Sequence, residues 1–252
     1  MDDRVDTLTI TSRGYELASH GTLPIAAYLR YLEHLRWRTI SRSQKIPLRL
    51  FWSMGVVRAQ VLEVFHSVSF DVELELSMWV SRVGRTSIEL SHDITRTDDG
   101  EVIGRSTATI VTLDENRRPA PVKDGAREFV VERPTVTAER LDAEPPPDAW
   151  QMPVHIRPSD QDLQQHVNQA RYADLVEDAR ISCARDGGYG PGDWASAPKR
   201  FVIAYESEAR VGDGVSAVTW AASGRARTAE FILRKENGQI ATRARLELAG
   251  SR

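Results

Sequence analysis

Between residues 160 and 170 the chain gathers side chains that could carry acid–base chemistry. Asp162, Gln164, His166 and Asn168 stand at every second position. A carboxylate can activate water, an imidazole can hold or shuttle a proton, and an amide can orient a water molecule or a substrate. Taken singly, three of them have a plainer use: Asp162 in a turn, His166 as a structural histidine and Asn168 as a helix N-cap. Together, at this spacing, they favour a functional site.

An amphipathic helix is expected directly after this segment and would position it. One face of that helix carries apolar residues at helical spacing, namely Tyr172, Leu175, Val176, Ala179 and Cys183. The first amides of a helix have no partner within the helix and lie at the positive end of its dipole. We therefore expect the backbone amides of Val167 and Asn168 to polarise a substrate carbonyl as oxyanion donors.

The chain contains a weak internal repeat. Residues 27–33 resemble residues 171–177, with Tyr28 and Tyr172 at an offset of 144. Residues 84–87 and 99–102 resemble residues 226–229 and 237–240 in the same order. The first copy repeats the helix pattern after Pro24, with apolar positions at Ile25, Tyr28, Leu29, Leu32 and Leu35. Three matches in one order predict a duplication.

Downstream of each predicted helix, hydrophobicity alternates with the period of a half-buried strand. We expect strands near 56–66, 69–82, 86–96, 102–113, 200–210, 215–223, 227–235 and 239–248, with hairpin turns at 97–100 and 236–238. The proline-rich stretch between the copies reads as a linker, with room for a short strand at 128–132. The pattern predicts an α+β protein with repeats at 1–118 and 151–252 and a linker at 119–150.

Composition narrows the functional classes. The 252 residues include 33 basic and 36 acidic side chains, and this net charge of −3 gives no general reason to bind nucleic acid. Cys183 is the only cysteine, so neither an internal disulfide nor a cysteine-based zinc site is expected. No apolar run reaches the length of a signal peptide or a membrane span. We expect a cytoplasmic protein without a membrane span, metal or redox cofactor.

The segment from Asp160 to Gln169 resembles the Asp-x-Asp-x-Asn-x-His-Val-Asn-Asn signature of hot-dog-fold thioesterases, and most closely that of acyl-acyl-carrier-protein (acyl-ACP) thioesterases. Residues 15–17, 57–61 and 79–84 are similar to parts of that family's N-terminal repeat. The resemblance implies a double hot dog, with one active site formed by the C-terminal repeat and the acyl chain housed largely by the N-terminal one. Ala18 and Thr22 stand opposite Asp162 and His166 in the first copy, which agrees with a single site.

The resemblance also assigns roles by position. It implies catalytic roles for Asp162 and His166, and for Gln164, which is one methylene longer than the family's asparagine. The family's catalytic glutamate and the cysteine after it fall on Glu208 and Ala209, at the end of the expected strand 200–210, which argues against a cysteine nucleophile.

Several choices stay open at this level. Asp162 or Glu208 activates water, or Asp162 attacks the thioester directly to form an anhydride. Glu206 competes with Glu208, being two residues away.

A basic stretch offers a second kind of site. Residues 30–49 carry one acidic side chain, Glu33, against six basic ones: Arg30, Arg36, Arg38, Arg42, Lys45 and Arg49. We expect Arg36 and Arg38 to form a landing surface for an acidic carrier protein or the phosphates of coenzyme A. The alternative is an ordinary solvated helix face.

The resulting hypothesis is a hydrolase that releases a fatty or other carboxylic acid from acyl-ACP or acyl-coenzyme A. One alternative is a hot-dog dehydratase or hydratase, which also uses aspartate and histidine at a helix end. Another is a protein that binds acyl thioesters without turning them over, which the replacements at Gln164 and Ala209 leave open. We expect a monomer that is internally a pseudo-dimer, or a homodimer.

Overall fold

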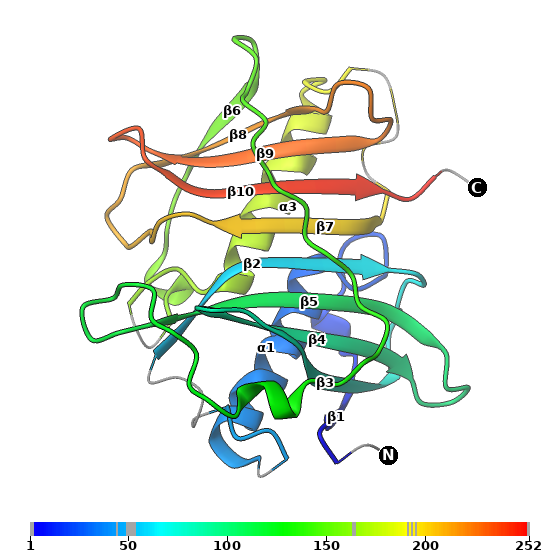
Figure 1. The fold of residues 1–252 in the computed structure, drawn as a ribbon. Helices are drawn as coiled ribbons and strands as arrows, with labels where there is room; N and C mark the ends of the chain where they lie inside the picture. Colours follow the sequence, from blue (N-terminus) through cyan, green and yellow to red (C-terminus); the bar gives the residue numbers. More distant parts are fainter. Residues whose placement is uncertain are drawn as a thin grey trace. The chain divides into compact units, whose positions relative to one another are not determined.

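The computed structural model describes residues 3–43, 45–48, 54–162, 165–190, 192, 194 and 196–250. Contacts divide the chain into two compact units, residues Met1–Ala138 and Glu139–Arg252. Each unit pairs one long helix with an antiparallel sheet of five strands in the described residues (Figure 1).

The first unit begins with β1 (Asp6–Thr11) and the helix α1 (Ile25–Arg42). Four longer strands follow: β2 (Met54–Val64), β3 (Glu73–Val83), β4 (Ser87–Arg96) and β5 (Val102–Leu113). In the sheet they lie in the order β1-β3-β4-β5-β2, and every neighbouring pair is antiparallel. Two short 3-10 helices, Gly14–Glu16 and Ala126–Phe129, complete the unit.

The second unit has β6 (Trp150–Val154), a 3-10 turn (Pro158–Asp160) and the helix α3 (Gln169–Arg185). The strands after the helix are β7 (Pro198–Tyr205), β8 (Val215–Ala221), β9 (Thr228–Lys235) and β10 (Ile240–Leu248). Their order in the sheet is β6-β8-β9-β10-β7, again antiparallel throughout. This is the order of the first unit, strand for strand, since β6 corresponds to β1 and β7 to β2.

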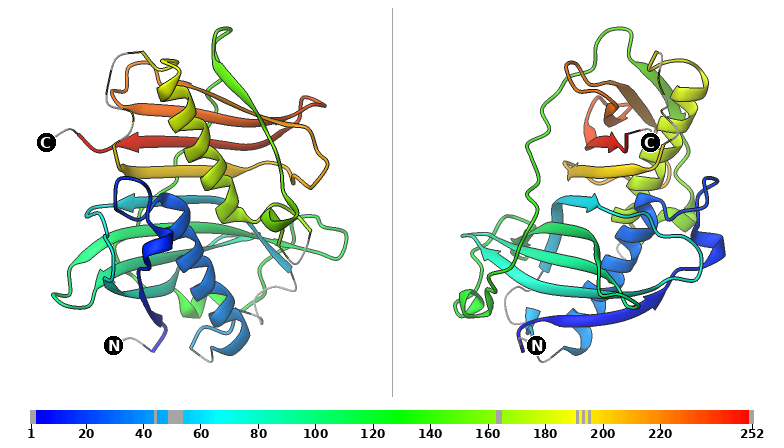
Figure 2. Two further views of the ribbon diagram at one scale, coloured as in Figure 1. Left: turned by 180° about the vertical axis from the view of Figure 1, so that it is seen from behind. Right: turned by 90° about the vertical axis from the view of Figure 1, so that its right-hand side faces the viewer.

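Each helix lies against one face of the sheet of its own unit (Figure 2). The predicted apolar stripes account for this, because Tyr28, Leu29 and Leu32 in α1 are buried, as are Tyr172, Val176 and Cys183 in α3. Burying such stripes against a sheet is the main source of stability for a helix of this length. The helices and the two hairpin turns were therefore predicted correctly.

Three strand predictions need correction. The third strand begins at Glu73 rather than near residue 69, because Asp71 takes a left-handed conformation (φ 59°) and Phe70 is exposed. The strand expected to end near residue 210 stops at Tyr205. Residues 128–132 form no strand; a 3-10 helix ends at Phe129 and Val130 makes a single bridge to Val80.

The proline-rich segment before β6 is tied to the second unit by ion pairs. Glu139 reaches Arg245 at 2.9 Å, and Glu144 reaches Arg243 at 2.7 Å. Leu141, in the same segment, is buried. No helix in the described parts of the chain is long and apolar enough to cross a membrane.

Candidate active site

A tight turn before α3 presents His166. The backbone N–H of Asp162 donates to the His166 carbonyl at 2.8 Å, and that of Gln165 donates to the Asp162 carbonyl at 3.0 Å. Gln165 has a φ of 63°, a left-handed conformation that residues with a Cβ rarely adopt. The turn closes at a bridge between Gln161 and Val167, so His166 lies where the chain enters the helix.

Asp160 anchors this turn from inside. Its side chain is 3% exposed and forms ion pairs with Arg171 at 3.0 Å and Arg157 at 3.1 Å. Burial acts to raise the pKa of Asp160, but hydrogen bonds from Arg157 and the charge of Arg171 outweigh it, so this pKa is lowered. Asp160 therefore has a buried structural role: its Oδ2 also accepts from the Arg157 backbone N–H at 2.9 Å.

The imidazole of His166 meets two charged side chains. Its Nε2 lies 2.9 Å from Oε2 of Glu208 and 2.8 Å from Nη2 of Arg210. Arg210 Nη2 also approaches Glu208 Oε2 at 3.3 Å. The His166 side chain is only 10% exposed, whereas that of Glu208 is 38% exposed, so the carboxylate is open to solvent and the ring is mostly covered.

Glu208 lies in the loop after β7, not on a strand as the sequence predicted. The next residue, Ala209, is 1% exposed and held by two hydrogen bonds. Its N–H donates to the Tyr172 hydroxyl at 3.2 Å, and its carbonyl accepts from Val167 N at 2.9 Å. Burial raises the pKa of Tyr172 to about 12, so this hydroxyl is neutral at ordinary pH. The loop is thus fixed to the start of α3.

The oxyanion prediction is wrong in this geometry. The Val167 amide donates to the Ala209 carbonyl, and the Asn168 amide donates to the Asp160 carbonyl at 2.8 Å. Neither can bind a substrate oxygen while these bonds persist. Asn168 serves instead as the N-cap of α3, its side-chain oxygen accepting from Ala170 N at 2.9 Å.

Two other predicted catalytic residues, Asp162 and Gln164, belong to the same motif. Asp162 is exposed, and its Oδ1 lies 3.3 Å from the backbone nitrogen of His166. Gln164 lies outside the described residues. The competitor Glu206 forms an ion pair with Arg243 on β10 at 3.2 Å. Of the two glutamates, Glu208 is therefore the one that contacts the histidine.

Sequence reasoning missed Arg210. The spacing of Glu208 and Arg210, two residues apart, was a weak signal. In an extended strand such residues lie on the same face, and charged pairs at this spacing are common on solvated faces. β7 ends at Tyr205, and Arg210 contacts His166 from the loop that follows. Cys183 is fully buried, and burial raises the pKa of its thiol to about 11, which confirms a core role.

The expected landing surface needs one correction. Arg36 is 5% exposed on the inner side of α1 and cannot contact a partner. Arg38 is exposed, as predicted, and so are Arg30, Arg42 and Lys45. Arg49 lies outside the described residues.

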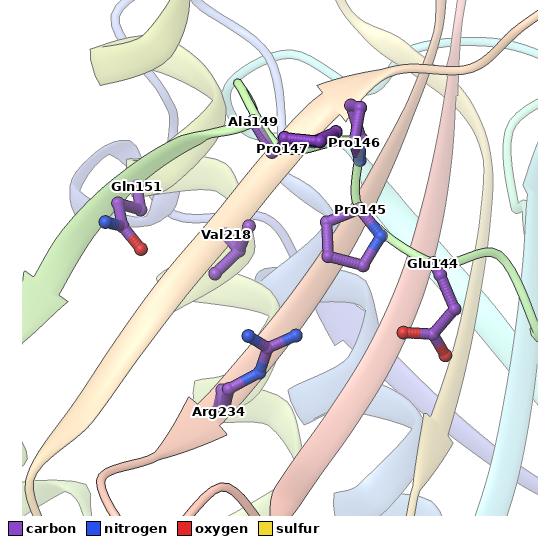
Figure 3. Close-up of a pocket in the computed structure, with 8 residues that line it drawn as sticks. All are labelled: Glu144, Pro145, Pro146, Pro147, Ala149, Gln151, Val218 and Arg234. Atoms are coloured by element: carbon purple, nitrogen blue, oxygen red, sulfur yellow. The ribbon is translucent and has the colours of Figure 1, made fainter.

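Two further features bear on the chemistry of the second unit. No group of three or more His, Cys, Asp or Glu side chains that could hold a metal ion occurs within the described ranges. A pocket of about 360 Å³ opens where the proline-rich segment crosses β8 and β9 (Figure 3). It is lined by Glu144, Pro145, Pro146, Pro147, Ala149, Gln151, Val218 and Arg234. His166, Glu208 and Arg210 do not line it.

Two protein-family models match parts of this chain. The sequence model of the acyl-ACP thioesterase C-terminal domain matches residues 144–249, and that of the thioesterase superfamily matches residues 20–103. No curated protein matches the chain.

Solved structures give the fold. An acyl-ACP thioesterase from Bacteroides thetaiotaomicron has 15% identity and a TM-score of 0.80, covering 99% of this chain and 100% of its own. The 12:0-ACP thioesterase from Umbellularia californica has 19% identity and a TM-score of 0.79, covering 98% of this chain and 95% of its own. The chain is thus a thioesterase: its residues 144–249 match the acyl-ACP thioesterase C-terminal domain, its residues 20–103 match the thioesterase superfamily, and it has the fold of the solved acyl-ACP thioesterases.

Proposed function

We propose that this thioesterase hydrolyses acyl thioesters carried on acyl carrier protein, or on coenzyme A, and releases the free carboxylic acid and the carrier thiol. One observation carries the proposal: within the stretch that matches the acyl-ACP thioesterase domain, His166 Nε2 and Glu208 Oε2 lie 2.9 Å apart. A carboxylate paired with an imidazole, open to solvent on one side, is suited to acid–base catalysis on water.

In the proposed reaction Glu208 acts as general base. Its carboxylate takes a proton from a water molecule as the water oxygen attacks the thioester carbonyl. The tetrahedral intermediate then collapses, the carbon–sulfur bond breaks, and the departing thiolate receives a proton through His166. The products are one carboxylic acid and one thiol. The water oxygen and one of its hydrogens become part of the acid, and the other hydrogen becomes the thiol proton. The solvent exposure of Glu208 supports this assignment, because the base must meet water.

Asp162 is the second carboxylate of the proposed site. Its Oδ1 accepts from the backbone of His166, and it holds the turn that presents the ring. We assign it a supporting role, because Glu208 contacts the imidazole and the Asp162 carboxylate accepts from the backbone of the same histidine. Gln164 is proposed to orient substrate or water, as the family resemblance implies.

We further propose that the two units descend from a duplication, with repeats at 1–118 and 151–252 joined by the linker at 119–150. The identical strand order of the two sheets supports this. The first repeat has lost the polar motif, having Ala18 and Thr22 where the second has Asp162 and His166. It is proposed to bind the acyl group rather than to catalyse.

The exposed side of α1 is the proposed carrier-binding surface. This basic helix face consists of Arg30, Arg38 and Arg42, together with Trp37, which is 55% exposed; Lys45 is exposed just after the helix. The chain as a whole carries a net charge of −3, so the face is a local positive region on an acidic protein. Such a region attracts an acidic carrier and speeds its encounter with the enzyme.

The test is thiol release from a panel of acyl-ACP and acyl-coenzyme A substrates. Glu208→Gln should lower kcat by about a hundredfold or more, the usual contribution of a general base. Glu206→Gln is the matched control: it makes the same change two residues away, where the side chain pairs with Arg243. Equal activity of the two variants would refute the role of Glu208.

The same panel separates the other functions. Conversion of 3-hydroxyacyl or enoyl thioesters without thiol release would indicate a dehydratase or hydratase. Tight binding without turnover would indicate a binding protein. We also propose a cytoplasmic location, which the buried lone thiol of Cys183 supports because disulfides accompany oxidising compartments. Light scattering would distinguish a monomer from a homodimer.

A further inference from the structure

Thioester hydrolysis places negative charge on the carbonyl oxygen, and this site must stabilise it. Enzymes supply preorganised donors for that purpose, often the first amides of a helix. Here the Val167, Asn168 and Ala170 amides donate to the Ala209 carbonyl, the Asp160 carbonyl and the Asn168 side chain. The Arg171 amide donates to the Asn168 carbonyl at 2.9 Å. The opening turn of α3 therefore has most of its donors occupied by the protein itself.

Arg210 is the cation beside the reacting pair. Its Nη2 lies 2.8 Å from His166 Nε2 and 3.3 Å from Glu208 Oε2. A guanidinium has five N–H donors and is always charged, and these two contacts involve only one of its nitrogens. The side chain is 57% exposed, so its other donors remain accessible to a substrate.

The backbone around Arg210 is held in place. Ala209, directly before it, is fixed by Tyr172 and Val167. Arg210 itself donates from its N–H to Asp213 Oδ2 at 3.0 Å and accepts at its carbonyl from Asp213 N at 3.1 Å. The contacts of Nη2 with His166 and Glu208 then hold the guanidinium beside the reacting pair, and a donor already in place suits electrostatic catalysis.

The two contacts at His166 Nε2 exclude each other. Glu208 can only accept, so that contact requires a proton on Nε2, whereas Arg210 can only donate and requires Nε2 to be bare. Arg210 therefore cannot form its hydrogen bond to Nε2 while Nε2 carries the proton and donates it to Glu208. A guanidinium N–H then becomes available at the centre of the site.

We propose that Arg210 is a further catalytic residue, which supplies the donor and the positive charge for the oxyanion in place of the helix amides. This assignment rests on the proposed thioesterase mechanism, because it concerns the same reaction. It predicts that Arg210 acts on the transition state more than on the bound substrate.

The experiment compares Arg210→Gln and Arg210→Lys with the wild-type protein on one acyl thioester. Loss of an oxyanion donor typically lowers kcat by about a hundred- to a thousandfold, and we expect this for Arg210→Gln with KM nearly unchanged. Arg210→Lys keeps the charge and should retain more of the activity. The matched control is Arg185→Gln, which removes an arginine of the same unit that is 75% exposed and paired with Asp186.

A second measurement reports the contact without relying on turnover. Nitrogen NMR of the neutral imidazole identifies which ring nitrogen of His166 carries the proton. In the wild-type protein Arg210 favours a bare Nε2, and in Arg210→Gln the proton should move to Nε2 and bond to Glu208. A merely structural arginine would leave the tautomer unchanged in a variant that keeps the wild-type melting temperature.

The outcomes are distinct. Unchanged kcat in Arg210→Gln overturns the assignment and leaves the thioesterase proposal standing. A rise in KM with kcat intact also overturns it, since Arg210 would then only bind substrate. A wild-type protein that hydrolyses no thioester overturns the proposed function and this assignment together. Loss of kcat with a shifted tautomer supports both.

Discussion

The hydroxyl of Tyr172 on α3 accepts a hydrogen bond from the buried backbone N–H of Ala209 at 3.2 Å. A single atom of the helix thereby fixes the loop that carries Glu208 and Arg210 on either side of Ala209. Tyr172 was expected to be a simple core residue, and its ring is indeed buried. Its polar end has a second use, which is to hold the proposed acid–base residues at the helix entrance.

Tyr172→Phe should therefore weaken both the fold and the reaction. The buried Ala209 N–H loses its acceptor, which costs about 2 kcal/mol of unfolding free energy. The loop then holds Glu208 less tightly, and we expect kcat to fall about tenfold. Urea unfolding and thiol release measure the two effects. Tyr15→Phe, at a side chain that is 79% exposed, should change neither, and an unaffected Tyr172→Phe would contradict the role of the hydrogen bond.

Asp162→Asn should separate the two carboxylates of the site. Asparagine keeps an oxygen that accepts from the His166 backbone, so the turn should survive. With Glu208 as the base, Asp162→Asn should retain kcat within about tenfold of wild type, well above the loss expected for Glu208→Gln. If Asp162 attacks the thioester itself, the asparagine variant would be as inactive as Glu208→Gln.

The basic helix face should affect KM for acyl-ACP substrates but not for acyl-coenzyme A. Replacing Arg38 and Arg42 by glutamate should raise KM for an acyl-ACP about tenfold, because an acidic partner is then repelled. KM for the matching acyl-coenzyme A should change far less, and added salt should narrow the difference. Arg140→Glu, where the side chain is 88% exposed, is the charge-reversal control. Equal effects on both substrates would argue against a carrier surface.

His92 should make the fold sensitive to acid. It is fully buried in β4. Burial, and then the charge of Arg36, lower the pKa of His92 to about 3 from an ordinary 6.5. The unfolded chain therefore takes up a proton between these values while the folded protein does not, so stability is full above pH 6.5 and falls as the pH is lowered toward 3.

The expected loss from this one group is about 4 kcal/mol between pH 6.5 and 3.5, at 1.36 kcal/mol per unit. His92→Leu should remove that part of the pH dependence, because leucine takes up no proton. Urea unfolding at several pH values measures the slope. A variant with the same slope as wild type would show that the acid sensitivity arises elsewhere.

The sequence predicts the helices and turns better than it predicts the contacts of the candidate site. Both helices and the hairpin turns followed from apolar spacing and turn residues, because burial of one face dominates their stability. The motif around His166 was recognisable because its residues are close in sequence. Glu208 was assigned by resemblance alone, and its contact with His166 could not be derived, since it depends on where β7 ends.

Two errors have a common physical cause. Arg36 was predicted to be an exposed cation and Val167 to have an available amide. Both predictions used charge or helix position alone, without the tertiary contacts. A charge count cannot tell that Arg36 lies on the inner side of α1. A helix rule cannot tell that the Ala209 carbonyl reaches Val167 N from a loop more than forty residues later. Both errors concern tertiary partners, which local pattern does not encode.

The left-handed Gln165 implies a trade-off between stability and activity. A residue with a Cβ in this conformation stores about 1 kcal/mol or more of strain, which glycine at the same position would relieve. Glycine would also give the turn many more conformations, and His166 follows directly in the chain. The protein thus carries a locally unfavourable residue where a stabilising replacement would loosen its histidine. Selection for heat resistance alone would be expected to favour changes here that reduce turnover.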